Sequence, residues 1–168
     1  MMIDQPIIFN PAKEKIRRGE PIFGISVFES LSPGIVRVVH QSGYDMLMVD
    51  REHAIHNDES ITSFILAARD HGLSPVVTVP TTDRILASRF LDAGALGINL
   101  CHTGTVEQVE EMVCWMKYPP IGERALALGP NANYRTDNPA LYCQQANEAT
   151  MLILKIESQK GVDNAKAL

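Results

Sequence analysis

The sequence lacks long apolar runs and clusters of basic residues. No apolar stretch approaches the roughly 20 residues that a membrane-spanning helix needs, and the first six residues lack the charged-then-apolar pattern of a secretory leader. We therefore expect a cytoplasmic protein that does not bind membranes. A net charge of -5 without any cluster of Lys or Arg argues against a nucleic-acid surface. The expected partner is a small molecule.

Cysteine is also scarce. The three cysteines, Cys101, Cys114 and Cys143, have neither zinc-type spacing nor an even number that would suggest a disulfide framework. We expect them to be small buried hydrophobic residues. Cys101 lies at the end of a predicted strand, so it is also a candidate site residue.

What the chain does have is a regular alternation of short apolar runs and helical patterns. Its 168 residues, 45% hydrophobic and 21% charged, suit a single domain over residues 1–168 with a substantial core. Strands are predicted at residues 23–28, 45–50, 75–79, 97–101 and 151–157, and helices at 34–41, 58–70, 83–92, 105–117 and 139–148, with a further helix beginning at Ser158. The strands are continuous apolar runs, which is typical of a parallel sheet covered on both faces. The fold class is therefore α/β.

Five βα units leave two architectures open. An eight-stranded (β/α)8 barrel typically takes about 250 residues, so this chain would hold only about the first five of its units. An open doubly wound sheet could be complete with five strands. The longest irregular segment, residues 118–137, is either a loop that carries binding groups or a surface excursion.

Ionisable residues gather where two predicted strands end. Asp50, Glu52 and His53 follow the second strand, and Glu157 ends the fifth. The carboxyl ends of parallel strands meet at one edge, so these side chains can converge into a site for a hard divalent cation or for proton transfer. The alternative is a structural ion-pair network with Arg51 and Lys155. His102, after the fourth strand, could also enter the site, although the sequence offers it no partner.

Several ordered motifs carry a family resemblance. They are Tyr44-Asp45-x-x-Met48-Val49-Asp50-x-Glu52-His53-Ala54, Pro75-Val76-Val77-x-Val79-Pro80, Leu91-Asp92-Ala93-Gly94-Ala95, Tyr118-Pro119-Pro120-x-Gly122-x-Arg124, Gln145-Ala146-Asn147 and Ile156-Glu157. Over roughly residues 21–168 the chain resembles the HpcH/HpaI aldolases, the class II pyruvate aldolases that include 2,4-dihydroxyhept-2-ene-1,7-dioate, 2-keto-3-deoxy-sugar-acid and macrophomate synthase-like enzymes.

The resemblance implies a TIM-type (β/α)8 barrel, normally a homo-oligomer, that cleaves a 4-hydroxy-2-oxo acid to pyruvate and an aldehyde or catalyses the reverse aldol addition. It implies a divalent ion, Mg²⁺ or Mn²⁺ first and Co²⁺ or Zn²⁺ second. Glu157 matches a metal ligand, and Glu52 matches an acid that holds metal-bound water. His53 matches the catalytic histidine, Asp92 matches the acid paired with it, and Asp50 matches a group at the substrate.

The chain departs from the resemblance at three places. Thr78 stands where the family usually has a substrate-binding arginine, and Lys155 stands where it usually has glutamine. We expect Lys155 to supply part of the positive charge missing at Thr78 and, by repelling a cation, to lower the affinity for the metal. The second metal ligand, an aspartate in a loop after the sixth strand, falls beyond Leu168, so the chain is not expected to complete the site by itself. Either the sequence is truncated or another chain supplies the remainder. Two alternatives stay open: a Schiff-base aldolase that uses Lys155, and a catalytically impaired remnant that binds an oxo acid or a partner subunit.

Overall fold

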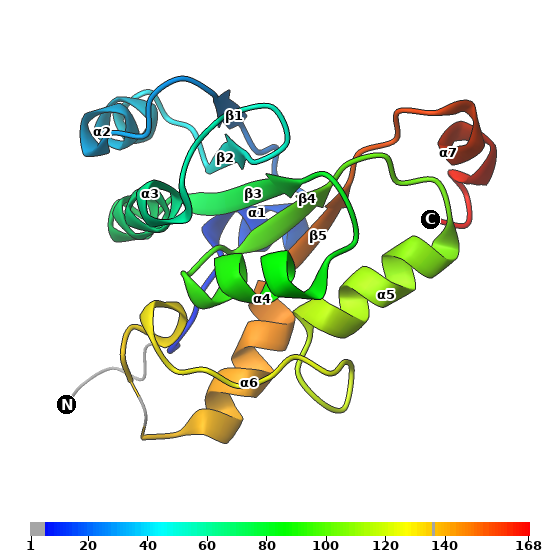
Figure 1. Cartoon of the computed structure of the whole chain (residues 1–168). Coiled ribbons are helices and arrows are strands. Elements are labelled where there is room, and N and C mark those ends of the chain that lie inside the picture. The colour runs from blue at the N-terminus through cyan, green and yellow to red at the C-terminus, as the bar shows by residue number, and fades with distance from the viewer. Residues whose placement is uncertain (1–5, 136) are drawn as a thin grey trace.

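The computed structural model describes residues 6–135 and 137–168, and its elements follow the predicted alternation of strands and helices (Figure 1). In chain order they are α1 (Pro11–Arg17), β1 (Gly24–Val27), α2 (Pro33–Gln41), β2 (Met46–Asp50), α3 (Asp58–Asp70), β3 (Ser74–Val79), α4 (Arg84–Asp92), β4 (Gly97–Leu100), α5 (Val106–Met116), the 3-10 turn η1 (Pro130–Ala132), α6 (Pro139–Ala149), β5 (Met151–Leu154) and α7 (Gln159–Asn164). Helix α1 and η1 were not predicted. The fifth strand ends at Leu154, three residues earlier than expected.

The strand order decides between the two architectures. All strand pairs are parallel, and the order in the sheet is β1-β2-β3-β4-β5. A doubly wound sheet reverses its strand order at a switch point, whereas a barrel adds each strand beside the one before it. The sheet therefore has the topology of five consecutive βα units of a TIM-type barrel, and the doubly wound alternative is wrong.

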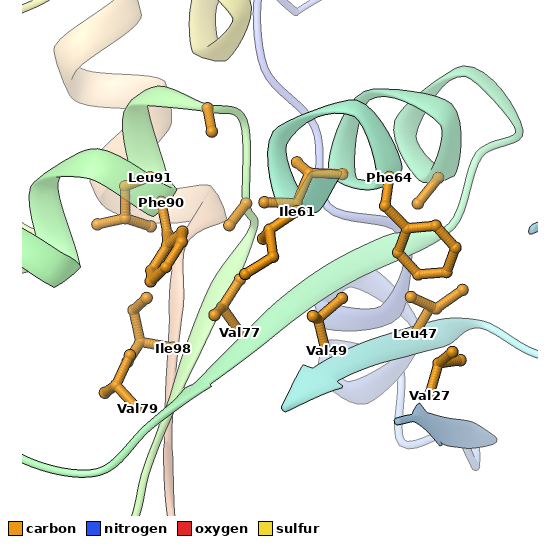
Figure 2. Close-up of a cluster of buried hydrophobic side chains, with 14 of the residues drawn as sticks. Val27, Leu47, Val49, Ile61, Phe64, Val77, Val79, Phe90, Leu91 and Ile98 are labelled. Carbon is orange, nitrogen blue, oxygen red and sulfur yellow. The ribbon is translucent and has the colours of Figure 1, made fainter. Parts of the chain in front are cut away.

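The main core lies between the sheet and helices α2 to α5. Figure 2 shows Val27, Leu47, Val49, Val77, Val79 and Ile98 of the strands facing Ile61, Phe64, Phe90 and Leu91 of α3 and α4, and all ten side chains are buried. Side chains alternate between the faces of a strand. The residues between these, such as Met48 and Val76, therefore face the other side, which corresponds to the inside of a barrel.

Asn10 connects the N-terminal segment to the amino-terminal ends of the strands through hydrogen bonds. Its buried amide donates to the carbonyls of Leu96 and Ala149, at 3.1 and 2.8 Å, and its Oδ1 accepts from the Ser74 hydroxyl and the Lys13 amide. Four partners from separate parts of the chain thus meet at one side chain.

Substitution of Asn10 with alanine is expected to lower the free energy of unfolding by about 2 kcal/mol, because buried carbonyls and a hydroxyl lose their partner. Urea denaturation monitored by circular dichroism measures the change. The control is Asn164→Ala, near the end of the chain, which removes a single hydrogen bond from Asn164 to the Gly104 carbonyl. It should lower the free energy of unfolding by about 1 kcal/mol or less. Equal losses in the two variants would contradict the anchoring role of Asn10.

Within the described residues, no helix combines the length and the apolar character needed to cross a bilayer.

Candidate functional site

The turn after β2 is built around Asp50. This buried carboxylate accepts two backbone hydrogen bonds through Oδ1, from Glu52 N at 2.8 Å and from His53 N at 2.6 Å. The two bonds fix the turn, in the way that an aspartate side chain commonly organises the backbone after it. Asp50 therefore positions the backbone of Glu52 and His53.

Glu52 and Glu157 converge at the carboxyl edge of the sheet, and two basic side chains lie between them. The His102 ring places Nε2 2.9 Å from Glu52 Oε1 and Nδ1 3.7 Å from Glu157 Oε2. The Lys155 ammonium lies 2.9 Å from Glu157 Oε1 and 3.8 Å from Glu52 Oε2. We call these four residues the acid-base ring. It joins the turn after β2, the turn after β4 and the segment after β5.

His53 lies at the margin of the acid-base ring. Its Nε2 is 3.5 Å from Glu52 Oε2, and its side chain is 69% exposed, against 10% for Glu52. An exposed imidazole whose backbone is fixed, beside a buried carboxylate, suits proton transfer to or from a bound molecule. The structure thus brings together four of the predicted site residues, Glu52, His53, Lys155 and Glu157.

Local charges set the protonation of the acid-base ring. The hydrogen bond from Lys155 lowers the pKa of Glu157, and the same contact raises the pKa of Lys155. The Cys101 thiol beside Glu52 lowers the pKa of that carboxyl group, with His102 acting in the same direction and burial opposing both. Burial and the nearby Glu52 raise the pKa of Cys101 to about 12. At neutral pH both carboxylates and the ammonium are charged, and the thiol is protonated.

Thr78 lies on the floor of the site. It is paired in register with Asp50 on one side and with Asn99 on the other. Both Thr78 and Asn99 are buried, and Asn99 Nδ2 donates to Thr78 Oγ1 at 3.0 Å. A neutral hydrogen-bonded pair therefore occupies the centre of the sheet here, where the resemblance implied a cation.

Asp92 lies at the other end of the molecule. It is the last residue of α4, and its Oδ1 accepts from Arg124 Nη2 at 2.6 Å and from Asn131 Nδ2 at 3.4 Å. A helix that follows a parallel strand runs back along it, so the end of α4 lies near the start of β4 and away from the strand tips. The expected pairing of Asp92 with His53 is therefore not formed within this chain. Arg124 and Asn131, from the irregular segment predicted at residues 118–137, also lie at that end. Residue 136 of that segment lies outside the described residues.

His102 is the main site residue that the sequence left undecided. Its backbone φ of 50° lies in the left-handed region, which residues other than glycine rarely adopt. This backbone turn directs the ring toward Glu52, while His102 N donates to Glu157 Oε2 at 3.2 Å. Cys101, considered as a minor candidate, is buried with its Sγ 3.8 Å from Lys155 Nζ.

The residues present do not fit the divalent ion that the resemblance implies. Among residues 6–135 and 137–168, no three His, Cys, Asp or Glu side chains are grouped as a metal site. A hard cation binds six or more oxygen ligands at 2.0 to 2.6 Å, but Glu157 Oε1 already contacts an ammonium group at 2.9 Å. The expectation of a metal held by Glu157 and Glu52 is not met by these residues as they stand.

Comparisons with known proteins agree with this architecture. The chain is 33% identical over 156 residues to the hydroxypyruvate/pyruvate aldolase of Delftia acidovorans, an alignment that covers 93% of this chain and 58% of the relative. It is 30% identical to the 2-keto-3-deoxy-L-rhamnonate aldolase of Klebsiella pneumoniae, with 96% and 60% covered. The crystal structure of an HpcH/HpaI aldolase from Desulfitobacterium hafniense superposes with a TM-score of 0.88 at 31% identity, with 91% and 59% covered.

The chain therefore spans less than two thirds of the length of these relatives. The sequence profile of the HpcH/HpaI aldolase/citrate lyase family matches residues 27–168, from the end of β1 onward. By this match, and by identities of 30% or more over nearly its whole length, the chain belongs to the HpcH/HpaI aldolase/citrate lyase family.

Proposed function

We propose that this chain is the part of a carbon-carbon lyase of the aldolase type that carries the proton-transfer histidine. The substrate class is a 4-hydroxy-2-oxo acid, which is cleaved to pyruvate and an aldehyde or formed from them. The observation that carries the proposal is the position of His53, exposed beside the buried Glu52 at the carboxyl edge of the sheet, in a chain of this family.

The proposed step uses His53 as the base. His53 takes the proton of the C4 hydroxyl, the C4 oxygen becomes the aldehyde carbonyl, and the C3–C4 bond breaks. The electron pair of that bond forms the enolate of pyruvate. The proton held by the His53 imidazolium is then delivered to C3, directly or through water, which releases pyruvate and restores the neutral base. Glu52 lies 3.5 Å from the His53 ring, so its negative charge stabilises the imidazolium that the step creates.

The test is a coupled assay in which lactate dehydrogenase reports pyruvate released from a panel of 4-hydroxy-2-oxo acids, including 2-keto-3-deoxy-L-rhamnonate. We expect turnover with at least one member of the panel. The neutral pair Thr78 and Asn99 lies on the floor of the site in place of a cation, which favours a second function, binding of an oxo acid without cleavage. Saturable pyruvate binding without turnover would support this second function. The absence of both binding and turnover would contradict both functions.

The structure disfavours a Schiff-base route through Lys155. That chemistry needs a neutral amine, and the Glu157 carboxylate raises the pKa of Lys155 and so favours the ammonium form. We expect borohydride reduction in the presence of pyruvate to leave the chain unlabelled by mass spectrometry. A mass increase that disappears in Lys155→Met would instead establish the lysine as the nucleophile.

A homo-oligomer is part of the same proposal. In the described sheet β1 is an edge strand, and the two residues that flank it, Phe23 and Phe28, are 62% and 49% exposed. Unpaired edges and exposed aromatic side chains are typical of surfaces that associate with another copy.

A further inference from the structure

The acid-base ring is closed, with the two basic groups each contacting both acids. His102 lies 2.9 Å from Glu52 Oε1 and Lys155 lies 2.9 Å from Glu157 Oε1, and the two cross contacts are longer, at 3.7 Å from His102 to Glu157 Oε2 and 3.8 Å from Lys155 to Glu52 Oε2. All four carboxylate oxygens thus face a nitrogen of the protein. Glu52 Oε2 is buried and accepts no hydrogen bond from the described residues. A divalent ion bound to both acids would have to displace at least one of these two side chains.

Lys155 is held at this place by its backbone. Lys155 N donates to the Leu100 carbonyl at 2.9 Å, and the Lys155 carbonyl accepts from Thr103 N at 3.1 Å. These bonds extend the pairing of β5 with β4 by one residue, and they hold Lys155 where its ammonium lies 2.9 Å from Glu157 Oε1. The position of the ammonium group is therefore a consequence of sheet register.

The buried acid explains why a cation is required. Glu52 is only 10% exposed, and a carboxylate removed from water is costly unless a positive charge or hydrogen-bond donors compensate. Lys155 provides a full charge, and it also contacts Glu157, which is nearer to the surface at 30% exposure. The protein thus carries its own counter-cation for the acid pair.

We propose that Lys155, assisted by His102, occupies in this chain the place between Glu52 and Glu157 that a divalent ion would otherwise take, so that a positive charge of the protein compensates one of the two carboxylates and excludes the metal. The inference deepens the proposed function by assigning the charge of its site. It does not depend on turnover, because metal binding is measured without substrate.

The test is the affinity of the purified chain for Mn²⁺, measured by isothermal titration calorimetry and by the electron paramagnetic resonance signal of free Mn²⁺. Replacement of the ammonium by a neutral group, in Lys155→Met and separately in Lys155→Gln, is expected to tighten Mn²⁺ binding at least about tenfold, because a cation no longer repels the ion. Lys155→Arg keeps the charge and should bind Mn²⁺ as weakly as the unaltered chain. Lys160→Met, which removes an exposed lysine outside the acid-base ring, should also leave binding unchanged.

One result would overturn the proposal. It is the absence of any gain in Mn²⁺ affinity in both neutral variants over the unaltered chain, with folding checked by circular dichroism, since the lysine would then not be what excludes the ion. A failed lyase assay would leave these measurements unaffected, so the two proposals can fail independently.

Discussion

Replacement of His53 with alanine is expected to lower kcat for cleavage of a 4-hydroxy-2-oxo acid by about 10²- to 10⁴-fold, the usual contribution of a positioned acid or base. The turn that presents His53 is fixed through its backbone by Asp50, so the substitution removes the imidazole and leaves the fold unchanged. KM should change much less than kcat, because an exposed ring 3.5 Å from Glu52 contributes mainly to proton transfer. Initial rates in the lactate dehydrogenase-coupled assay measure both.

His40→Ala is the matched control. His40 is exposed in the last turn of α2, and because α2 runs back from the tip of β1, its end lies away from the carboxyl edge of the sheet. The control should retain full activity. If His53→Ala kept more than about a third of the wild-type kcat, His53 would not be the base, and the ring of His102, which contacts Glu52 at 2.9 Å, would be the next group to test.

Replacement of Asp92 with alanine is expected to destabilise the chain by about 3 to 5 kcal/mol, because it leaves a buried guanidinium without its carboxylate. The Arg124 side chain is 1% exposed and contacts Asp92 at 2.6 Å, and its guanidinium lies over the Tyr118 ring, 4.7 Å from the centroid. Among the described residues, Asp92 is the only acid that forms an ion pair with Arg124, so the guanidinium charge would be left uncompensated. Urea denaturation of the variant and of the unaltered chain measures the difference.

A double substitution separates the ion pair from side-chain volume. Arg124→Leu added to Asp92→Ala removes the stranded charge and should recover part of the loss, because an apolar replacement of a buried ion pair is often well tolerated. A loss below about 0.5 kcal/mol in Asp92→Ala, together with a loss of lyase activity, would show instead that Asp92 acts in the reaction, as the family resemblance first implied.

Most of the sheet could be predicted from sequence because its strands appear as uninterrupted apolar runs, the pattern of strands covered on both faces. β3 and β4 are buried at every residue, whereas β1 and β5 are only partly buried. Helix α1 could not be predicted. It has only seven residues, several of them charged, and besides its local cap Asn10 it is held by a contact distant in sequence, from Ala12 N to the Ser74 hydroxyl. Such contacts leave no periodic pattern in the local sequence.

The candidate site divides in the same way. Glu52, His53 and Glu157 could be placed together because each follows a parallel strand at the same edge. His102 could not be placed, since its ring direction depends on a positive φ that the sequence does not signal. Asp92 was assigned to the site by likeness alone, although its place at the end of a helix that runs back along the sheet indicates the opposite edge.

The hydrogen-bond register between β4 and β5 has a chemical consequence. Leu100 is paired with Leu154, and Lys155 N continues the pairing by donating to the Leu100 carbonyl, so Lys155 leaves the end of β5 on the face opposite Leu154. A shift of the last strand by one position would present Leu154 and Ile156 to Glu52 instead, and the buried acid would lose its nearest full positive charge. Backbone pairing at the carboxyl ends of β4 and β5 thus determines which side chain faces the buried acid.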